Sequence, residues 1–201
     1  MKKNKLMGHF KKVISNMDSR PVLQCVNYNE NGAIYATDSH VAIKISDFHN
    51  NEGSFNFNLL TMEINDLTYP DVGRNFEMTD IKAEINVDID LLTKALKPFL
   101  ISTLYTNCVD LTIKENILEI KSKTLGGFKI EVPLHDCEGE IELSCQPQYL
   151  INGLQFIKDA KASKKDMNNG LALIQFNNPV RPFKLNLDDE FEYLVTPVRT
   201  S

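Results

Sequence analysis

Residues 81–96, IKAEINVDIDLLTKAL, decide the fold, because their apolar residues first alternate with polar ones and then change to helical spacing. The alternating half predicts a strand, and Asp88 is a candidate N-cap for the helix that follows. The same change of spacing returns at residues 141–157, IELSCQPQYLINGLQFI, with Pro147 at the expected first helical position. The chain therefore contains two copies of one strand–helix pattern.

Three further alternating segments follow each predicted helix. They lie at 109–113, 118–120 and 128–134 in the first copy, and at 171–176, 182–187 and 191–198 in the second. Each copy is a βαβββ unit, and alternation of period two indicates antiparallel sheets with one buried face. Two such units can cover each other's apolar faces. We therefore predict an α+β fold in which residues 79–201 form one complete domain.

Residues 1–78 resemble a partial third copy of the unit. The helix comes first, and its apolar positions are Leu6, Phe10, Val13, Ile14 and Met17. The predicted strands follow at 21–28, 32–37, 40–46 and 55–64. Residues 65–78 have turn chemistry and make the expected linker. We predict a shortened domain at 1–78 that ends in this linker.

Composition indicates a soluble, cytoplasmic protein. The chain has 201 residues, of which 42% are hydrophobic and 24% charged. No apolar run reaches the roughly 18 to 20 residues that cross a bilayer, and the N-terminus lacks the apolar core of a secretory signal. We therefore expect no membrane partner.

Segments that contain catalytic residue types lack a catalytic arrangement. Asp38-Ser39-His40 has the letters of a triad, but neighbours in an extended chain point to opposite faces. The pair Gly126-Gly127 has no phosphate-loop context, and the four cysteines lack zinc-site spacing. We expect no catalytic residue, metal or cofactor.

Charge is distributed unevenly along the chain. The net charge is −5, yet residues 1–20 carry +5, residues 88–102 carry 0 and residues 147–165 carry +3, which leaves −13 on the rest. One interpretation is that lysine is frequent in these segments because it is a good helix former. The alternative is a helical face that meets the phosphates of duplex DNA through non-specific backbone contacts. The candidate DNA-facing residues are Lys2, Lys3, Lys11, Lys12, Lys94, Lys97, Lys158, Lys161, Lys164 and Lys165.

Three segments carry a resemblance to a known family. Residues 20–45 read RPVLQCVNYNENGAIYATDSHVAIKI, residues 69–76 read YPDVGRNF and residues 192–201 read EYLVTPVRTS. In this order they resemble the bacterial DNA polymerase III beta subunit, the sliding clamp. That family has an Arg-Pro-x-Leu strand start, an Ala-Thr-Asp-x-His strand, a Tyr/Phe-Pro-Asp linker and a C-terminal Pro-x-Arg.

The resemblance implies a DNA-clamp fold with antiparallel sheets outside and helices inside. Residues 79–201 resemble the C-terminal clamp domain and residues 1–78 a shortened middle domain, while the usual N-terminal domain is missing. The implied function is a processivity factor that encircles duplex DNA as a homo-oligomeric ring and is loaded by a clamp loader. With fewer domains in each chain, ring closure would need more chains, through heterologous interfaces. The compact form suggests a phage or another mobile element.

The resemblance also implies a pocket that binds short apolar peptides of DNA polymerases and other partners. Carried over by motif, its residues are Leu23, Thr37, His40, Pro70, Arg74, Leu194, Val195, Pro197, Val198 and Arg199. The chain departs from the family pattern at Val41, Ala42, Asn75 and Thr196. The alternative interpretation is that these residues pack the domain junction.

Two other functions stay open at this stage. A clamp mimic would keep the fold but bind and inhibit a host clamp or its partners without forming its own ring. An unrelated enzyme or structural module is the third reading, and a broad hydrolase screen would test it.

Overall fold

The structure is a computed structural model that describes residues 1–101, 108–122, 126–164 and 170–199. The helices are α1 (Lys3–Phe10), α2 (Ile89–Leu96) and α3 (Pro147–Lys164), with 3-10 turns η1 (Pro21–Gln24), η2 (Gly73–Phe76) and η3 (Lys97–Ile101). The strands are β1 (Cys25–Tyr28), β2 (Ile34–Thr37), β3 (Val41–Ile45), β4 (Phe55–Asn58), β5 (Ile64–Asn65), β6 (Ala83–Asp88), β7 (Val109–Lys114), β8 (Ile117–Lys121), β9 (Lys129–Pro133), β10 (Asp136–Gly139), β11 (Ile141–Cys145), β12 (Leu171–Phe176), β13 (Phe183–Leu187) and β14 (Phe191–Val195).

The repeated strand–helix pattern is present at both predicted places. Asp88 caps α2, because its carboxylate accepts a hydrogen bond from the backbone N–H of Leu91 at 2.7 Å. Pro147 is the first residue of α3, where its missing N–H costs no helical hydrogen bond. The sheet strands that follow each helix pair with antiparallel neighbours, as the alternation predicts.

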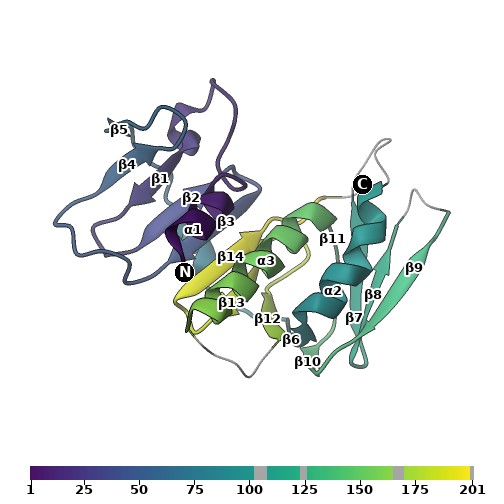
Figure 1. The fold of residues 1–201 in the computed structure, drawn as a ribbon. Helices are drawn as coiled ribbons and strands as arrows, with labels where there is room; N and C mark the ends of the chain where they lie inside the picture. Colours follow the sequence, from purple (N-terminus) through teal and green to yellow (C-terminus); the bar gives the residue numbers. More distant parts are fainter. Residues whose placement is uncertain (102–107, 123–125, 165–169, 200–201) are drawn as a thin grey trace.

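One antiparallel sheet of ten strands runs through the molecule, in the order β10-β6-β12-β13-β14-β3-β2-β1-β4-β5 (Figure 1). Its seam is the pairing of β14 with β3, from Phe191 opposite Ile45 to Val195 opposite Val41. Strands from the two predicted domains thus share a single sheet. The division of the chain at residue 78 stays a prediction.

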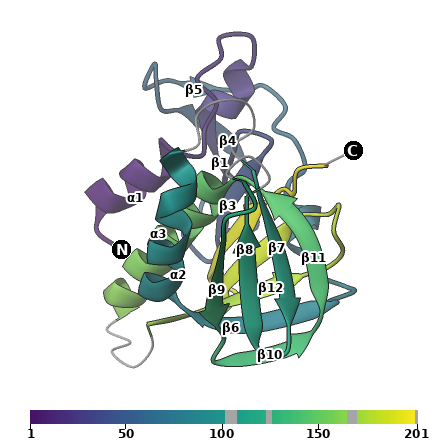
Figure 2. The same cartoon turned by 90° about the vertical axis from the view of Figure 1, so that its right-hand side faces the viewer.

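A second sheet of four strands, β11-β7-β8-β9, packs with the helices around the main core. Helix α3 contacts both α1 and α2, so the helices lie together on one side of the sheets (Figure 2). This matches the expected arrangement of helices on one face and sheets on the other.

Several boundaries differ from the sequence prediction. Helix α1 ends at Phe10, and Met17 is 60% exposed rather than part of an apolar helical face. The predicted strand 21–28 begins with the turn η1, and the predicted strand 55–64 is divided into β4 and β5. Strand β10 was not predicted, because it is a mostly exposed edge strand without alternation.

Candidate peptide pocket and basic helical face

The predicted linker is packed against the sheet. Phe76 at the end of η2 is buried beside Tyr35, Ala42 and Leu194, which lie on the sheet face opposite the main core. The rings of Tyr35 and Phe76 have centroids 6.1 Å apart. This second, small apolar cluster fixes the course of the linker across the seam.

A buried cluster of charges holds the end of the linker. Lys184 of β13 lies 2.8 Å from one carboxylate oxygen of Glu192 in β14, and Lys44 of β3 lies 2.6 Å from the other. The ammonium of Lys184 also donates a hydrogen bond to the carbonyl of Phe76 at 3.2 Å. The cluster therefore ties three adjacent strands to the linker.

A small hollow opens between the linker and the seam. Its volume is about 260 Å³, and its lining residues are Leu23, Thr37, Ser39, Val41, Ala42, Pro70, Asp71, Val72, Asn75, Pro182, Leu194 and Thr196. The floor is mainly aliphatic and the rim polar, which is the chemistry that an apolar side chain of a peptide needs. Hereafter this hollow is called the apolar pocket.

Four of the ten predicted pocket residues line the apolar pocket: Leu23, Thr37, Pro70 and Leu194. Val195 belongs to the main core instead, since neighbouring residues of a strand point to opposite faces, and Pro197, beyond the end of β14, is buried without lining the pocket. Arg74 is 82% exposed in its side chain and pairs with Asp71 at 2.6 Å. The structure therefore brings together only part of the predicted set.

The remaining predicted residues do not line the apolar pocket. Val198 donates its backbone N–H to the carbonyl of Ser144 at 2.7 Å, and Arg199 is exposed. His40 stands on the other side of the β2–β3 turn, where its ring stacks on Tyr149 with centroids 6.1 Å apart. The prediction missed other lining residues, among them Ser39, Val72 and Pro182. The first two lie within two residues of a predicted pocket residue in sequence, and Pro182 directly precedes β13.

His40 borders a second, larger hollow of about 700 Å³. Its lining residues are Lys11, Lys12, Ile14, Ser15, Asn16, Met17, Arg20, Asp38, His40, Gln148, Tyr149 and Asn152. Three cations and one carboxylate give the lining a net positive charge. The first turn of α3 also adds the positive end of its helix dipole. Hereafter this hollow is called the cationic groove.

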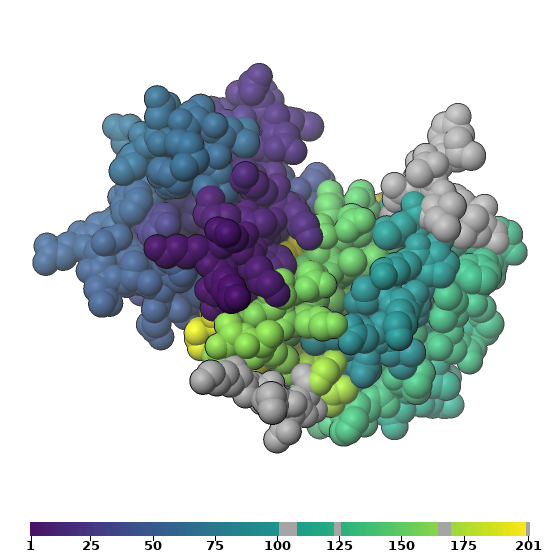
Figure 3. Space-filling model, in the orientation of Figure 1, coloured from purple at the N-terminus to yellow at the C-terminus, as the bar shows by residue number. Residues whose placement is uncertain are grey.

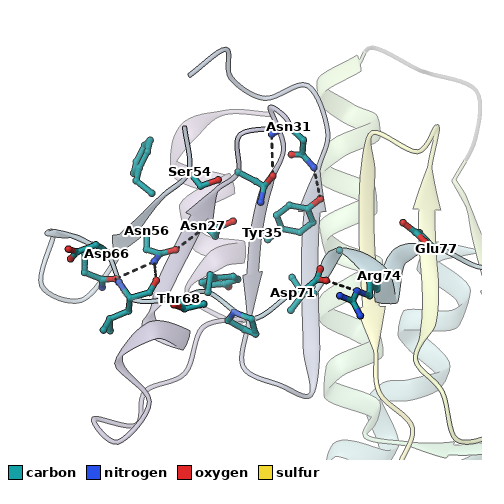
Figure 4. A pocket seen from close by; sticks show the side chains of 18 residues that line it. Asn27, Asn31, Tyr35, Ser54, Asn56, Asp66, Thr68, Asp71, Arg74 and Glu77 are labelled. Carbon is teal, nitrogen blue, oxygen red and sulfur yellow. Dashed lines mark hydrogen bonds and ion pairs between the residues drawn. The ribbon is translucent and has the colours of Figure 1, made fainter. Parts of the chain in front are cut away.

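A third hollow of about 710 Å³ lies on the sheet face beside the linker (Figure 4). Its wall is rich in amides that bond to one another: Asn27 donates to Asn56 at 2.9 Å, and Asn56 donates to Asn65 and to the carbonyl of Leu67. Of the predicted pocket residues, it contains Pro70 and Arg74. The amides thus anchor the linker to β1 and β4.

The predicted DNA-facing lysines divide into two groups. Those of the α1 region and of α2 (Lys2, Lys3, Lys11, Lys12, Lys94 and Lys97) are exposed and form no ion pair with the described residues. In α3, Lys158 pairs with Asp90 at 2.5 Å, and Lys164 pairs with Asp188 and Glu190 at 2.9 and 2.6 Å. Lys161, also in α3, is half-buried, and Lys165 lies outside the described residues. Among the predicted lysines that the structure describes, the unpaired positive charge therefore lies in α1 and α2 and in the residues that flank them, on the helical face that Figure 3 views.

Neighbouring cations and burial shift several titrations. The ion pair with Lys158 lowers the pKa of Asp90, so this carboxylate stays charged beside the helical lysines. Burial raises the pKa of the Cys145 thiol, which keeps it protonated and unreactive. Among the residues that the structure describes, no three His, Cys, Asp or Glu side chains gather as metal ligands do.

No family model and no curated protein matches the sequence. Solved structures do match. The beta chain of DNA polymerase III from Streptococcus pneumoniae is 23% identical with a TM-score of 0.73, and the match covers 98% of this chain and 62% of that one. The sliding clamp of Bacillus subtilis is 22% identical with a TM-score of 0.76 (98% and 63%). A putative beta subunit from Eubacterium rectale is 12% identical with a TM-score of 0.80 (98% and 63%).

The chain thus has the α+β fold of the DNA clamps. More particularly, its fold is that of the bacterial DNA polymerase III beta subunit, and the resemblance seen in the sequence is confirmed at the level of the fold. The chain spans less than two thirds of the length of these three solved structures. Within the described residues, no helix is both long and apolar enough to span a membrane.

Proposed function

We propose that the chain is a sliding-clamp-like processivity factor that holds a DNA polymerase on duplex DNA. One observation carries the proposal: within the clamp fold, unpaired lysines gather on the helical face, while an apolar pocket opens elsewhere, between the linker and β14. The first feature suits sliding on a phosphate backbone, and the second suits a tethered partner. The protein then acts by binding and is not an enzyme.

On the DNA side, exposed lysines act as mobile point charges that favour the backbone without fixing a sequence. Copies of the chain would close head to tail into a ring with the helices inside. Each chain would supply the two proposed domains, 1–78 and 79–201, and a clamp loader would open the ring.

On the partner side, the apolar pocket would receive a peptide of the polymerase. All ten pocket residues carried over by motif stay candidates, with Leu23, Thr37, Pro70 and Leu194 in direct contact. A cytoplasmic replication system of a phage or another mobile element is the proposed setting.

The test examines both ring formation around DNA and the contacts of the lysines with phosphates. Light scattering should give a discrete oligomer, and the protein should stay on circular DNA but slide off linear DNA. The charge reversals Lys94→Glu and Lys97→Glu should weaken the salt dependence of binding. The slope of log affinity against log salt should become less negative by about 1.8 if both lysines contact phosphates. The matched control reverses Lys114 and Lys121, which lie on the four-stranded sheet. A monomer at all concentrations, or an equal effect of both double variants, would refute the proposal.

The clamp mimic is the second candidate, and the ion pairs of α3 favour it. Lys158 and Lys164 are paired with carboxylates of this chain, so α3 offers less free charge to a phosphate backbone than its sequence predicts. A mimic would form a stable heterocomplex with a host clamp or polymerase in a pulldown and no ring of its own.

A further inference from the structure

The third hollow, between the outer face of the sheet and the linker, has a wall of asparagine side chains. Hereafter it is called the amide hollow. Asn27, Asn56 and Asn65 are neighbours on β1, β4 and β5, because the register places Asn56 opposite both of the others. Asn27 is 5% exposed and lines the hollow, and Figure 4 shows it between Asn56 and Tyr35.

Backbone groups fix the direction in which these amides bond. The carbonyl of Leu67 can only accept, so Asn56 must direct its Nδ2 toward that oxygen, at 2.6 Å. The Oδ1 of Asn56 therefore faces Asn27 and accepts a hydrogen bond from its Nδ2 at 2.9 Å. At the other end, the Oδ1 of Asn65 accepts from the backbone N–H of Leu67 and from Asn56. The hydrogen-bonded row thus runs in one direction and starts at Asn27.

The start of this row is an open acceptor. Within the described residues, the side chain of Asn27 forms only the hydrogen bond to Asn56, and its Oδ1 accepts none. Donation by the Nδ2 of Asn27 polarises its amide and makes the oxygen a stronger acceptor. Buried polar groups are normally hydrogen-bonded, so this nine-tenths buried side chain is completed by a donor that enters the hollow.

The charges of the lining favour a donor that is also a cation. Asp66 and Glu77 form no ion pair with the described residues, whereas Arg74 pairs with Asp71 at 2.6 Å. Three carboxylates against one guanidinium leave the lining with a net charge of −2. The volume of about 710 Å³ falls in the range of small-molecule sites. An anion is therefore disfavoured, and a neutral ligand would leave both free carboxylates without a counter-charge.

We propose that the amide hollow binds a small alkyl polyamine, with one ammonium group on the Oδ1 of Asn27 and another beside Asp66 or Glu77. Each primary ammonium group brings three N–H donors, which suits a wall that offers amide and carboxylate oxygens. The linker supplies both carboxylates and β1 supplies Asn27, so the ligand would hold the linker against the sheet. The inference does not depend on the proposed function.

The test is isothermal titration calorimetry with hexamethylenediamine and hexamethonium at about 50 mM NaCl. The two dications have the same charge and the same spacing, but hexamethonium carries methyl groups in place of the N–H donors. We expect hexamethonium to bind about tenfold more weakly, because a hydrogen bond to a charged group contributes more than an exposed charge pair alone. Equal affinities of the two dications would overturn the inference, and so would the absence of binding by either.

Charge variants locate the site. Asp66→Asn with Glu77→Gln should weaken the binding of hexamethylenediamine about fivefold, since each variant residue removes one exposed charge from the lining. The matched control, Asp47→Asn with Glu63→Gln, changes the net charge equally at exposed residues outside the lining. The control should leave the affinity within about twofold. Equal losses in the two double variants would show a non-specific attraction to an acidic protein and overturn the inference.

A third variant tests the open acceptor. Asn27→Ala removes the acceptor and also the donor to Asn56, so urea denaturation must first show that the variant is folded. The affinity for hexamethylenediamine should then fall to that for hexamethonium, while the affinity for hexamethonium stays unchanged. A folded variant that still prefers the diamine would overturn the assignment of Asn27. If the variant does not fold, the ligand pair and the charge variants still decide between the outcomes.

Discussion

Replacing Glu192 with Leu tests whether the buried charge cluster holds the seam together. The side chain of Glu192 is 2% exposed and that of Lys184 is 7% exposed, so removing the carboxylate leaves the Lys184 ammonium buried without a counter-charge. Breaking a buried ion pair from one side costs about 3–5 kcal/mol. We expect a loss of that size in the free energy of unfolding, measured by urea denaturation, with an unchanged m-value.

Two further variants test whether the loss comes from the unpaired buried charge. The double change Lys184→Met with Glu192→Leu should cost less than Glu192→Leu alone, because it removes the unpaired charge as well. The control is Glu190→Gln at the exposed pair with Lys164, which should cost less than about 1 kcal/mol. If Glu192→Leu falls in the range of this control, or if the double change costs more than the single one, the cluster does not stabilise the seam.

The remaining predictions concern helices and pH. Gly153→Ala in α3 should destabilise the protein by about 1–3 kcal/mol, because the new Cβ would lie 2.7 Å from the ring of Tyr193. Gly8→Ala in α1 meets no atom within 4 Å and should stabilise the protein by up to about 1 kcal/mol. Thermal unfolding that ranks the two variants the other way would contradict the packing. Asp88→Ala should cost about 1 kcal/mol in the same assay through loss of the α2 cap, and no loss would show that the cap is not needed. Burial lowers the pKa of His9 below 6.5, so its neutral form is favoured in the fold and stability should fall as the pH drops below 6.5; His9→Gln should flatten that slope, and an unchanged slope would rule out His9 as its source.

The regular alternation of the sheets made much of the fold predictable. Residues 109–113, VDLTI, alternate without a break, and β7 begins at the predicted residue and ends one residue beyond the predicted end. The end of α1 was not predictable, since Val13 and Ile14 stay buried after the helix stops at Phe10. Ser15 donates its backbone N–H to Leu23 rather than to a helical carbonyl, and only the folded chain brings that acceptor near.

The candidate site was predictable only in part. Motif comparison selects residues by their neighbours in sequence, so it included Val195 together with Leu194. The strand directs these two side chains to opposite faces, and only Leu194 lines the apolar pocket. The cationic groove was not predicted as one hollow, although Lys11, Lys12 and His40 were predicted site residues. Its lining comes from three separate segments of the chain.

The seam between β14 and β3 also affects synthesis on the ribosome. Residues 41–45 leave the ribosome long before residues 191–195, which are their partners on one side. Until then β3 presents an unpaired, largely apolar edge, which is a template for pairing with other chains. The nascent chain must therefore remain shielded during most of its translation, and folding should be completed only when β14 emerges and closes that edge.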